Sequence, residues 1–192
     1  MARAFLQWVL MLALGASPSA LAQPDFKATP TTIETAEGGL DNILLVETDN
    51  EQFSLSIPRG YGSQARDDTR SIIFTSGAGV SVITVQFTTN YPGALPKQDR
   101  LRDQVAANHP GASLVESSVS STDFGPAQSF DLFRPAGNGL MLRIRDTYVA
   151  SPQGSVEFTF SCNGADFDKE KLGFARLLNS FRLLPKDDKK NP

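Results

Sequence analysis

The chain has 192 residues, of which 20% are charged, and its 18 Lys and Arg against 21 Asp and Glu give a formal net charge of −3. It holds one cysteine, Cys162, one histidine, His109, and one tryptophan, Trp8. A single cysteine excludes a disulfide within the chain, and these counts exclude a metal site built from several cysteine or histidine ligands. A weakly acidic chain without a basic block is also a poor candidate for binding nucleic acid.

The first 22 residues have the pattern of a secretory signal peptide. Arg3 gives a positive start, Phe5–Leu14 is apolar apart from Gln7, and Ala20-Leu21-Ala22 matches a cleavage site of small residues. A membrane-spanning helix needs about 20 apolar residues to cross ~30 Å of hydrocarbon, and this run is half as long. No cysteine follows it that could carry a lipid. We therefore expect residues 1–22 to be removed and the mature chain, without a transmembrane segment, to be periplasmic or extracellular.

The composition of the remaining chain predicts one domain with loose ends. Pro24, Pro30 and Gly38-Gly39 interrupt a polar stretch, so residues 23–42 are expected to form a flexible tether. Pro185 and the charged residues after it predict a disordered tail over residues 185–192. Residues 43–184 remain as a single domain, which is long enough to bury a core without a disulfide.

The apolar periodicity predicts strands first and then a mixture of strands and helices. Ile43–Thr48 and Phe53–Ile57 flank Asp49-Asn50, and Arg70–Thr75 and Val80–Thr88 flank a glycine-containing turn, so each pair predicts a hairpin. The spacing of apolar residues over Pro96–Ala107 predicts a helix. Alternating segments then predict four strands: Ser113–Val119, Ala127–Phe133, Leu140–Ala150 and Ser155–Cys162.

A second helix is predicted over residues 167–183. Phe174, Leu177, Leu178 and Phe181 follow one another at helical spacing and form one apolar face, which we expect to pack in the core. Sequential hairpins with separate helices favour an α+β domain. We expect an α/β sandwich, in which two helices pack on a mainly antiparallel sheet of about six to eight strands.

Two segments carry a resemblance to a known family. Gln52–Tyr61 contains a polar residue, a phenylalanine, a strand and then a proline-x-glycine-aromatic step. The end of the domain has a phenylalanine-rich strand, a short acidic connection and a helix that finishes in Leu178-Asn179-Ser180-Phe181. These features are similar to the PsbP-like, or Mog/PsbP-type, α/β-sandwich superfamily, which includes the DcrB-like exported bacterial proteins. The resemblance implies a non-enzymatic accessory or adaptor protein.

The clearest arrangement of charge is on the strand predicted over residues 140–150. Alternation places Arg143 and Arg145 on one face with Met141, Thr147 and Val149. They could form ion pairs with Glu157 or Asp131, or they could recognise an anionic partner. Tyr61 and Tyr91 lie beside Gly and Pro turns, where amphipathic rings can anchor an interface. We therefore regard these two arginines and two tyrosines as possible partner-binding residues.

The other reactive side chains are expected to have structural roles. His109 lies in a proline-glycine helix stop without a G-x-S-x-G nucleophile motif elsewhere, so we expect a solvated turn residue. Cys162 shares a strand face with Phe158 and Phe160, which predicts a buried, inert thiol. The acidic pairs lack the spacing of a calcium loop, so we expect no metal and no cofactor. These pairs are Asp67-Asp68, Asp166 with Asp168, and Asp187-Asp188.

These observations favour an exported accessory protein without catalytic residues that binds a protein partner in the cell envelope. One alternative is a carrier of a small molecule or lipid, with an apolar space between sheet and helix. Its lining would be phenylalanine: Phe124, Phe130, Phe158, Phe160 and Phe174. A second alternative is an exported hydrolase centred on His109.

Overall fold

The computed structural model describes residues 26–34, 38–49, 51–122, 125–137 and 139–185. The predicted leader, Phe124 and the tail after Pro185 lie outside these residues. The described elements begin with six strands: β1 (Lys27–Glu34), β2 (Leu40–Glu47), β3 (Gln52–Ser56), β4 (Tyr61–Arg66), β5 (Ser71–Ser76) and β6 (Ser81–Thr88). They continue with α1 (Gln98–Asn108), β7 (Ser113–Thr122), β8 (Gly125–Pro135), β9 (Met141–Ser151), β10 (Gly154–Asn163), α2 (Phe167–Ser180) and β11 (Arg182–Leu184).

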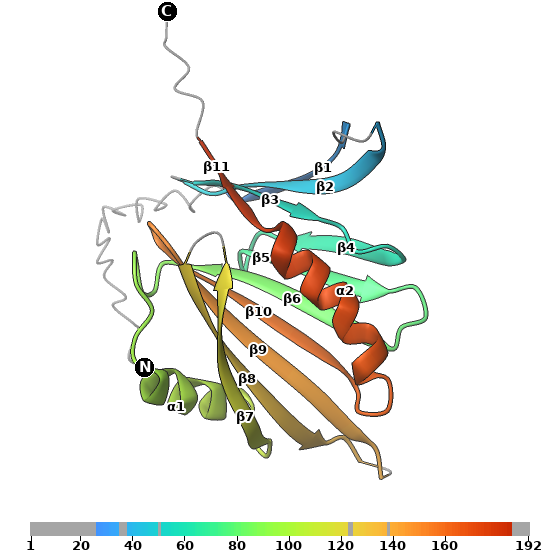
Figure 1. Ribbon diagram of the computed structural model, residues 1–192, viewed down its shortest axis with the longest axis vertical. Helices are drawn as coiled ribbons and strands as arrows, with labels where there is room; N and C mark the ends of the chain where they lie inside the picture. The colour runs from blue at the N-terminus through green and yellow to red at the C-terminus, as the bar shows by residue number, and fades with distance from the viewer. Residues whose placement is uncertain (1–25, 35–37, 50, 123–124, 138, 186–192) are drawn as a thin grey trace, which may run out of the picture.

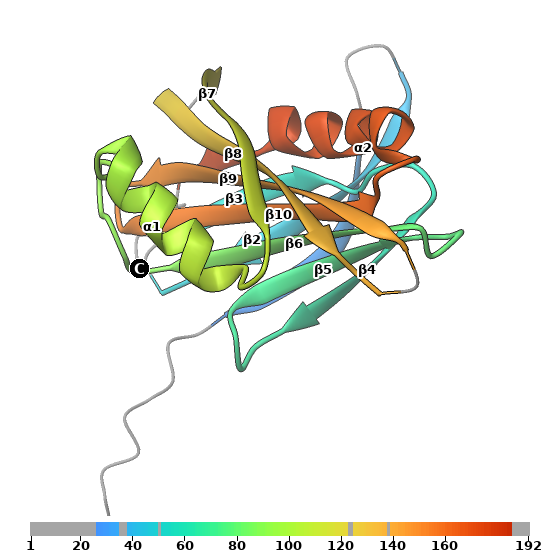
Figure 2. The ribbon, with the colours of Figure 1, turned by 90° about the horizontal axis from the view of Figure 1, so that it is seen from below.

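The strands form two antiparallel sheets. The smaller has four strands in the order β1-β2-β3-β11, and the larger has seven in the order β4-β5-β6-β10-β9-β8-β7. The smaller sheet lies beyond the β4–β5 side of the larger one, and α2 crosses in front of the larger sheet and leads into β11 of the smaller one (Figure 1). The two helices lie on opposite faces of the seven-stranded sheet (Figure 2). The predicted α+β sandwich, with two helices and mainly antiparallel strands, is therefore confirmed.

The main core lies between α2 and the two sheets and is filled by aromatic rings. Phe160 stacks on Phe174 with ring centres 5.4 Å apart, and Phe53 stacks on Phe181 at 5.2 Å. Phe158 meets Phe181 edge to face, also at 5.2 Å. Contacts of this kind leave no space between the rings, because aromatic rings at these separations are in van der Waals contact.

The filled core contradicts the carrier alternative. Phe158, Phe160 and Phe174 are buried against their neighbours instead of lining a space. Phe130 does not face the same side, because it packs in a second cluster with Leu101 and Val105 of α1. The expected common lining was therefore wrong for Phe130, which lies on the face of the sheet that packs against α1.

Three segments differ from the sequence prediction. Lys27–Glu34 pairs with β2, so part of the expected tether over residues 23–42 is strand, and buried Phe26 fixes its start. Tyr61–Arg66 forms β4 although it has no apolar alternation, because it pairs with β5 at an exposed edge.

The last helix also ends earlier than predicted, at Ser180. The Ser180 hydroxyl donates to the carbonyl of Leu177 at 2.7 Å and accepts the backbone N–H of Ser56 at 2.8 Å. Phe181 then adopts an extended backbone and the chain joins β3 as β11. Neither described helix combines the length and the apolar character that crossing a membrane requires.

Candidate functional site

The candidate site surrounds the turn between β3 and β4, residues Pro58–Tyr61. The backbone N–H of Tyr61 donates to the carbonyl of Pro58 at 3.0 Å, and Gly60 has φ +80°, as a type II turn requires at its third position. Gly77 donates its backbone N–H to the carbonyl of Gly60 at 2.7 Å, which ties this turn to the β5–β6 turn. The turn is therefore held from both sides.

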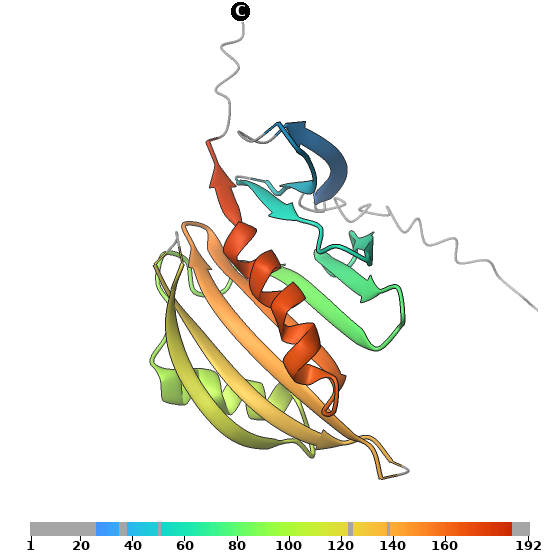
Figure 3. The same ribbon diagram turned by 45° about the vertical axis from the view of Figure 1, so that its right-hand side comes forward.

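Three adjoining hollows of about 390, 540 and 240 Å³ meet at Pro58 and Arg59. One wall comes from β1 and the start of β2, and the other from α2, which lies beside β3 and β4 (Figure 3). We call this surface the Arg59 groove. Its lining includes Leu40, Arg59, Tyr61, Lys169, Leu172 and Arg176.

The Arg59 groove carries positive charge that the described chain does not neutralise. The side chains of Arg59, Lys169 and Arg176 make no hydrogen bond or ion pair with any described residue. One of the two acidic groups in the lining, Glu170, already accepts two hydrogen bonds from within the fold. The other acidic group is Asp41, so the cations that line the groove outnumber its carboxylates.

Two exposed leucines border the same groove. Leu40 at the start of β2 is 75% exposed, and Leu172 on α2 is 59% exposed. A single exposed leucine is ordinary on a protein surface. Two that flank a cationic hollow give the groove both apolar and charged contacts.

Tyr61, one of the predicted partner-binding residues, fixes the floor of the groove. Its hydroxyl lies 2.6 Å from the Ser81 hydroxyl and donates to Glu170 Oε2 at 3.0 Å, while Ser81 donates to the same oxygen at 2.7 Å. Its ring lies against Gly173 of α2. Burial raises the pKa of Tyr61, so the hydroxyl keeps its proton and remains a donor. Tyr61 thus fastens the turn to α2.

Arg143 and Arg145 share one face of β9, as predicted, and this face is turned toward Phe167 of α2. Arg145 donates two hydrogen bonds to Asp131, from Nε at 2.6 Å and from a terminal nitrogen at 2.7 Å, and Arg143 reaches the same carboxylate at 3.5 Å. Both guanidinium groups also lie over the Phe167 ring, 3.9 and 5.5 Å from its centre. The hydrogen bonds that Arg145 donates to Asp131 raise the pKa of its guanidinium group. The structure therefore supplies one of the predicted ion pairs, to Asp131, whereas Glu157 faces the opposite side of the sheet.

Tyr91 lies far from the groove, on the α1 side of the molecule. Its hydroxyl donates to Gln104 of α1 at 2.8 Å, and Arg100 lies 5.8 Å from its ring centre. The four predicted partner-binding residues therefore do not form one site. The arginines lie over Phe167 at the start of α2, Tyr61 bonds to Glu170 further along α2, and Tyr91 packs in the α1 cluster on the opposite face of the sheet.

His109 is not the solvated turn residue that the sequence predicts. Its side chain is 12% exposed, and Nε2 lies 2.6 Å from Oδ2 of the fully buried Asp146. This hydrogen bond raises the pKa of His109, although burial opposes it. The ring is largely shielded from solvent because α1 ends at Asn108, and the next residue, His109, reaches Asp146 on β9. His109 therefore anchors the end of α1 to the sheet.

The same buried cluster contains a second carboxylate. Tyr148 donates its hydroxyl to Glu157 Oε1 at 3.0 Å, and burial raises the pKa of Tyr148. Burial, followed by the charge of Asp146, raises the pKa of Glu157 to about 7. A polar cluster thus lies beneath α1 and consists of His109, Asp146, Tyr148 and Glu157. In the sequence, only the alternation of residues along β9 and β10 indicates it.

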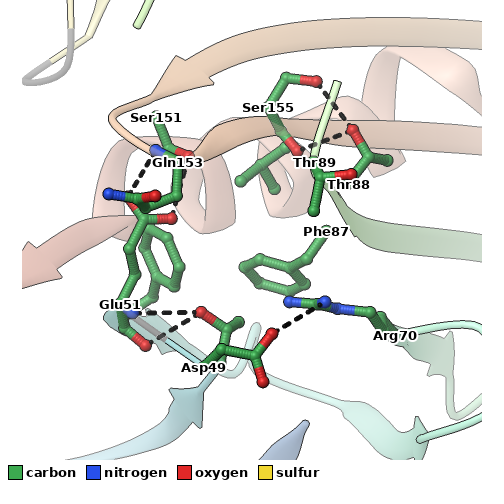
Figure 4. Close-up of a pocket in the computed structure, with 12 residues that line it drawn as sticks. Asp49, Glu51, Arg70, Phe87, Thr88, Thr89, Ser151, Gln153 and Ser155 are labelled. Atoms are coloured by element: carbon green, nitrogen blue, oxygen red, sulfur yellow. Dashed lines mark hydrogen bonds and ion pairs between the residues drawn. The ribbon is translucent and has the colours of Figure 1, made fainter. Parts of the chain in front are cut away.

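A small polar pocket of about 90 Å³ lies where the ends of the two sheets meet (Figure 4). Glu51 accepts hydrogen bonds from the Ser151 hydroxyl at 3.1 Å and from the backbone N–H of Gln153 at 3.2 Å. Arg70 reaches Asp49 at 3.4 Å. These bonds connect the β2–β3 segment with the larger sheet, so the pocket is a polar tie between the sheets.

Cys162 is buried, as the strand pattern predicts. It is 3% exposed and lies in the main core. Burial raises the pKa of its thiol to about 11. A thiol in this environment stays protonated and is a poor nucleophile.

No family model matches the chain, and no curated protein matches it. Among solved structures, the cyanobacterial PsbP protein CyanoP from Synechocystis sp. PCC 6803 aligns with a TM-score of 0.54 at 11% identity, over 89% of this chain and 99% of CyanoP.

The chain has a PsbP-like fold. Two further structures align with it at lower scores. The protein PA94 from Pseudomonas aeruginosa, described as a putative regulator of unknown function, has a TM-score of 0.47 and 17% identity, over 82% of this chain and 97% of PA94. The Ran-binding protein Mog1p from Saccharomyces cerevisiae has a TM-score of 0.47 and 11% identity, over 81% of this chain and 96% of Mog1p. The likeness to CyanoP at 11% identity establishes the fold and not an activity.

Of the six groove residues, the sequence predicted only Tyr61 as a candidate; the five that it did not indicate are Leu40, Arg59, Lys169, Leu172 and Arg176. Arg59 lies inside the proline-x-glycine-aromatic step that carried the family resemblance. The sequence therefore predicted the turn but gave no role to the charge of Arg59. Leu172 and Arg176 are four residues apart and therefore share one face of α2. The face of α2 opposite its apolar stripe was the sequence pattern that could have indicated these two residues.

Proposed function

We propose that the chain is an exported, non-catalytic accessory protein that binds a protein partner in the cell envelope, and that the Arg59 groove is its contact surface. The observation that carries this proposal is the gathering of unneutralised cations and exposed leucines around a turn that is held rigidly. Rigid, exposed and mixed apolar and charged surfaces suit specific binding, because little conformational freedom is lost on association.

Two further observations support the proposal. The leader expected over residues 1–22 would direct the chain to the envelope. His109, the only histidine, is occupied in anchoring α1 to Asp146, which leaves it poorly placed as a general base for an exterior substrate. Arg143, Arg145 and Tyr91 stay predictions for additional partner contacts.

Site-specific photo-cross-linking in cells tests the contact surface. A photoreactive amino acid replaces Leu172 in the groove, and a matched variant carries it at Val119 on β7, which is 62% exposed and lies outside the groove. We expect a discrete protein adduct from position 172 and none of the same mass from position 119. The same adducts from both positions, or none from position 172, would contradict the proposal.

Fractionation tests the export step separately. A chain without residues 1–22 is expected to remain in the cytosol, whereas the full chain reaches the periplasm or the medium. Export of the shortened chain would show that the leader is not where we propose.

A further inference from the structure

Three cations of the Arg59 groove gather around one concave surface and have no counter-ion among the described residues. Arg143 and Arg145 have Asp131, Arg70 has Asp49, and Lys171 has Asp168. Arg59, Lys169 and Arg176 have no such acceptor among the described residues. The missing acceptors are carboxylates or similar anions, since guanidinium groups bind these in a two-pronged geometry.

We propose that the groove takes an acidic, amphipathic segment of the partner protein, with carboxylates at Arg59 and Arg176 and apolar side chains against Leu40 and Leu172. This inference rests on the function proposed above and names the chemistry of the same site. The cations of the groove favour acidic side chains in the partner segment, and the exposed leucines favour apolar ones.

The placement of the two arginines suits an extended contact. Arg59 comes from the β3–β4 turn and Arg176 from α2, so they belong to separate elements that meet in two of the hollows. Each can therefore take its own carboxylate. Lys169 lies two turns before Arg176 on the same face of α2 and extends the cationic strip along the helix.

The groove is also prepared for binding before a partner arrives. Tyr61 joins the turn to α2 through Ser81 and Glu170, and the Gly60–Gly77 hydrogen bond holds the turn from the other side. The backbones that carry Arg59 and Arg176 are therefore fixed relative to each other. A preformed site of this kind loses less entropy on binding than a flexible loop does.

An anionic membrane surface would also attract these cations. A concave groove with walls from the first hairpin and α2 favours a narrow segment over a flat bilayer, because a bilayer cannot enter the hollows. The test below separates the two.

Binding is measured by fluorescence anisotropy on protein purified from cells that express the full chain. The probe is a short fluorescent peptide that alternates leucine and glutamate, and its matched control carries glutamine in place of each glutamate. We expect the acidic peptide to bind, the glutamine peptide to bind at least about tenfold more weakly, and added salt to weaken the acidic peptide.

Charge reversal then assigns the binding to the groove. Arg59→Glu and Arg176→Glu are each expected to weaken the acidic peptide by about tenfold, since each removes one charge-assisted contact. Arg102→Glu is the control, because Arg102 is exposed on α1 and carries the same change of charge away from the groove. All three side chains are exposed, so the melting temperatures are expected to stay close to that of the unchanged protein.

Several outcomes would overturn the inference. These are equal binding of the two peptides, equal losses in Arg59→Glu and Arg102→Glu, or binding to phosphatidylglycerol vesicles without binding of the peptide. If the adduct from position 172 persists in the Arg59→Glu, Arg176→Glu double variant, the acidic-segment inference fails while the proposed function stands. If position 172 gives no adduct in the otherwise unchanged chain, the proposed function fails as well.

Discussion

Two arginine pairs flank the same helix and have opposite environments. Arg143 and Arg145 share Asp131, whose side chain is 5% exposed, and they lie over the Phe167 ring at the start of α2. Arg59 and Arg176 are exposed on the other flank and have no acceptor among the described residues. The first pair completes the fold, and the second leaves charge available to another molecule.

The difference shows that an arginine's role depends on where its counter-ion is. A half-buried arginine whose carboxylate is inside the fold stabilises the folded state, because removing either partner leaves a desolvated charge. An exposed arginine adds little to stability and retains its charge for binding.

Removing the internal counter-ion tests the first pair most strongly. Asp131→Ala leaves Arg145 half-buried without its carboxylate, so we expect the free energy of unfolding to fall by about 2–3 kcal/mol. Chemical denaturation measures this change. A fall of less than about 0.5 kcal/mol in the free energy of unfolding would mean that Asp131 contributes no more than an exposed carboxylate does. The contrast between the two arginine pairs would then disappear.

The buried cluster beneath α1 extends the same principle to pH. Glu157 has its pKa raised from 4.5 to about 7, and the pKa of His109 is raised above 6.5, so both bind protons more tightly in the folded state. The stability that Glu157 contributes is complete below its unfolded pKa and is lost as the pH rises towards 7, and that of His109 is lost as the pH rises above 6.5. The groups that face this pair are Asp146, Tyr148 and Arg134.

We therefore expect the free energy of unfolding to fall by on the order of 2 kcal/mol between about pH 5 and about pH 8 through this cluster. Denaturation curves at the two pH values measure it. Glu157→Gln should flatten the Glu157 part of the dependence, while Glu34→Gln, at an exposed position on β1, should leave the whole dependence in place. Identical pH profiles for the two variants would contradict the assignment.

Tyr61 connects the fold to the groove. Tyr61→Phe keeps the ring against Gly173 but removes the hydroxyl that bonds to Ser81 and Glu170, so we expect a loss of about 1 kcal/mol in stability. Thermal unfolding checks this. An unchanged melting temperature would mean that the hydroxyl does not hold the turn to α2.

The exposed pair should give the smallest change in stability. Arg59→Ala and Arg176→Ala are each expected to alter the free energy of unfolding by less than about 0.5 kcal/mol. The same denaturation measurement serves as the counterpart to Asp131→Ala. A loss above about 1 kcal/mol would show that these arginines have an unrecognised role within the fold.

Much of the fold followed from periodicity, and the rest depended on long-range pairing. The alternation of Val156, Phe158 and Phe160 predicted the buried face of β10, and helical spacing predicted the packed face of α2. No local pattern could indicate β4 or β1, because both are exposed strands whose order comes from hydrogen bonding to a neighbour. Pairing across the chain is decided by tertiary structure, which overrides local preference.

The candidate site was predictable only in part for the same reason. The sequence correctly placed Arg143 and Arg145 on one face and named Asp131 as one possible partner, and it singled out Tyr61. It placed His109 in solvent, because nothing in a proline-glycine helix stop indicates that the helix ends over the buried Asp146. Arg59 and Arg176 are 117 residues apart in sequence (176 − 59), so only the folded chain brings them together.

The central claim is that the exposed arginine pair binds a partner and the paired arginines maintain the fold. The most direct test is the yield of the adduct from position 172 in cells, measured for an Arg59→Gln, Arg176→Gln double variant and for Arg143→Gln. Arg143 is the weaker of the two contacts to Asp131, so its variant is expected to fold. We predict that the double variant loses the adduct and that Arg143→Gln retains it. Loss of the adduct in Arg143→Gln with retention in the double variant would contradict the account.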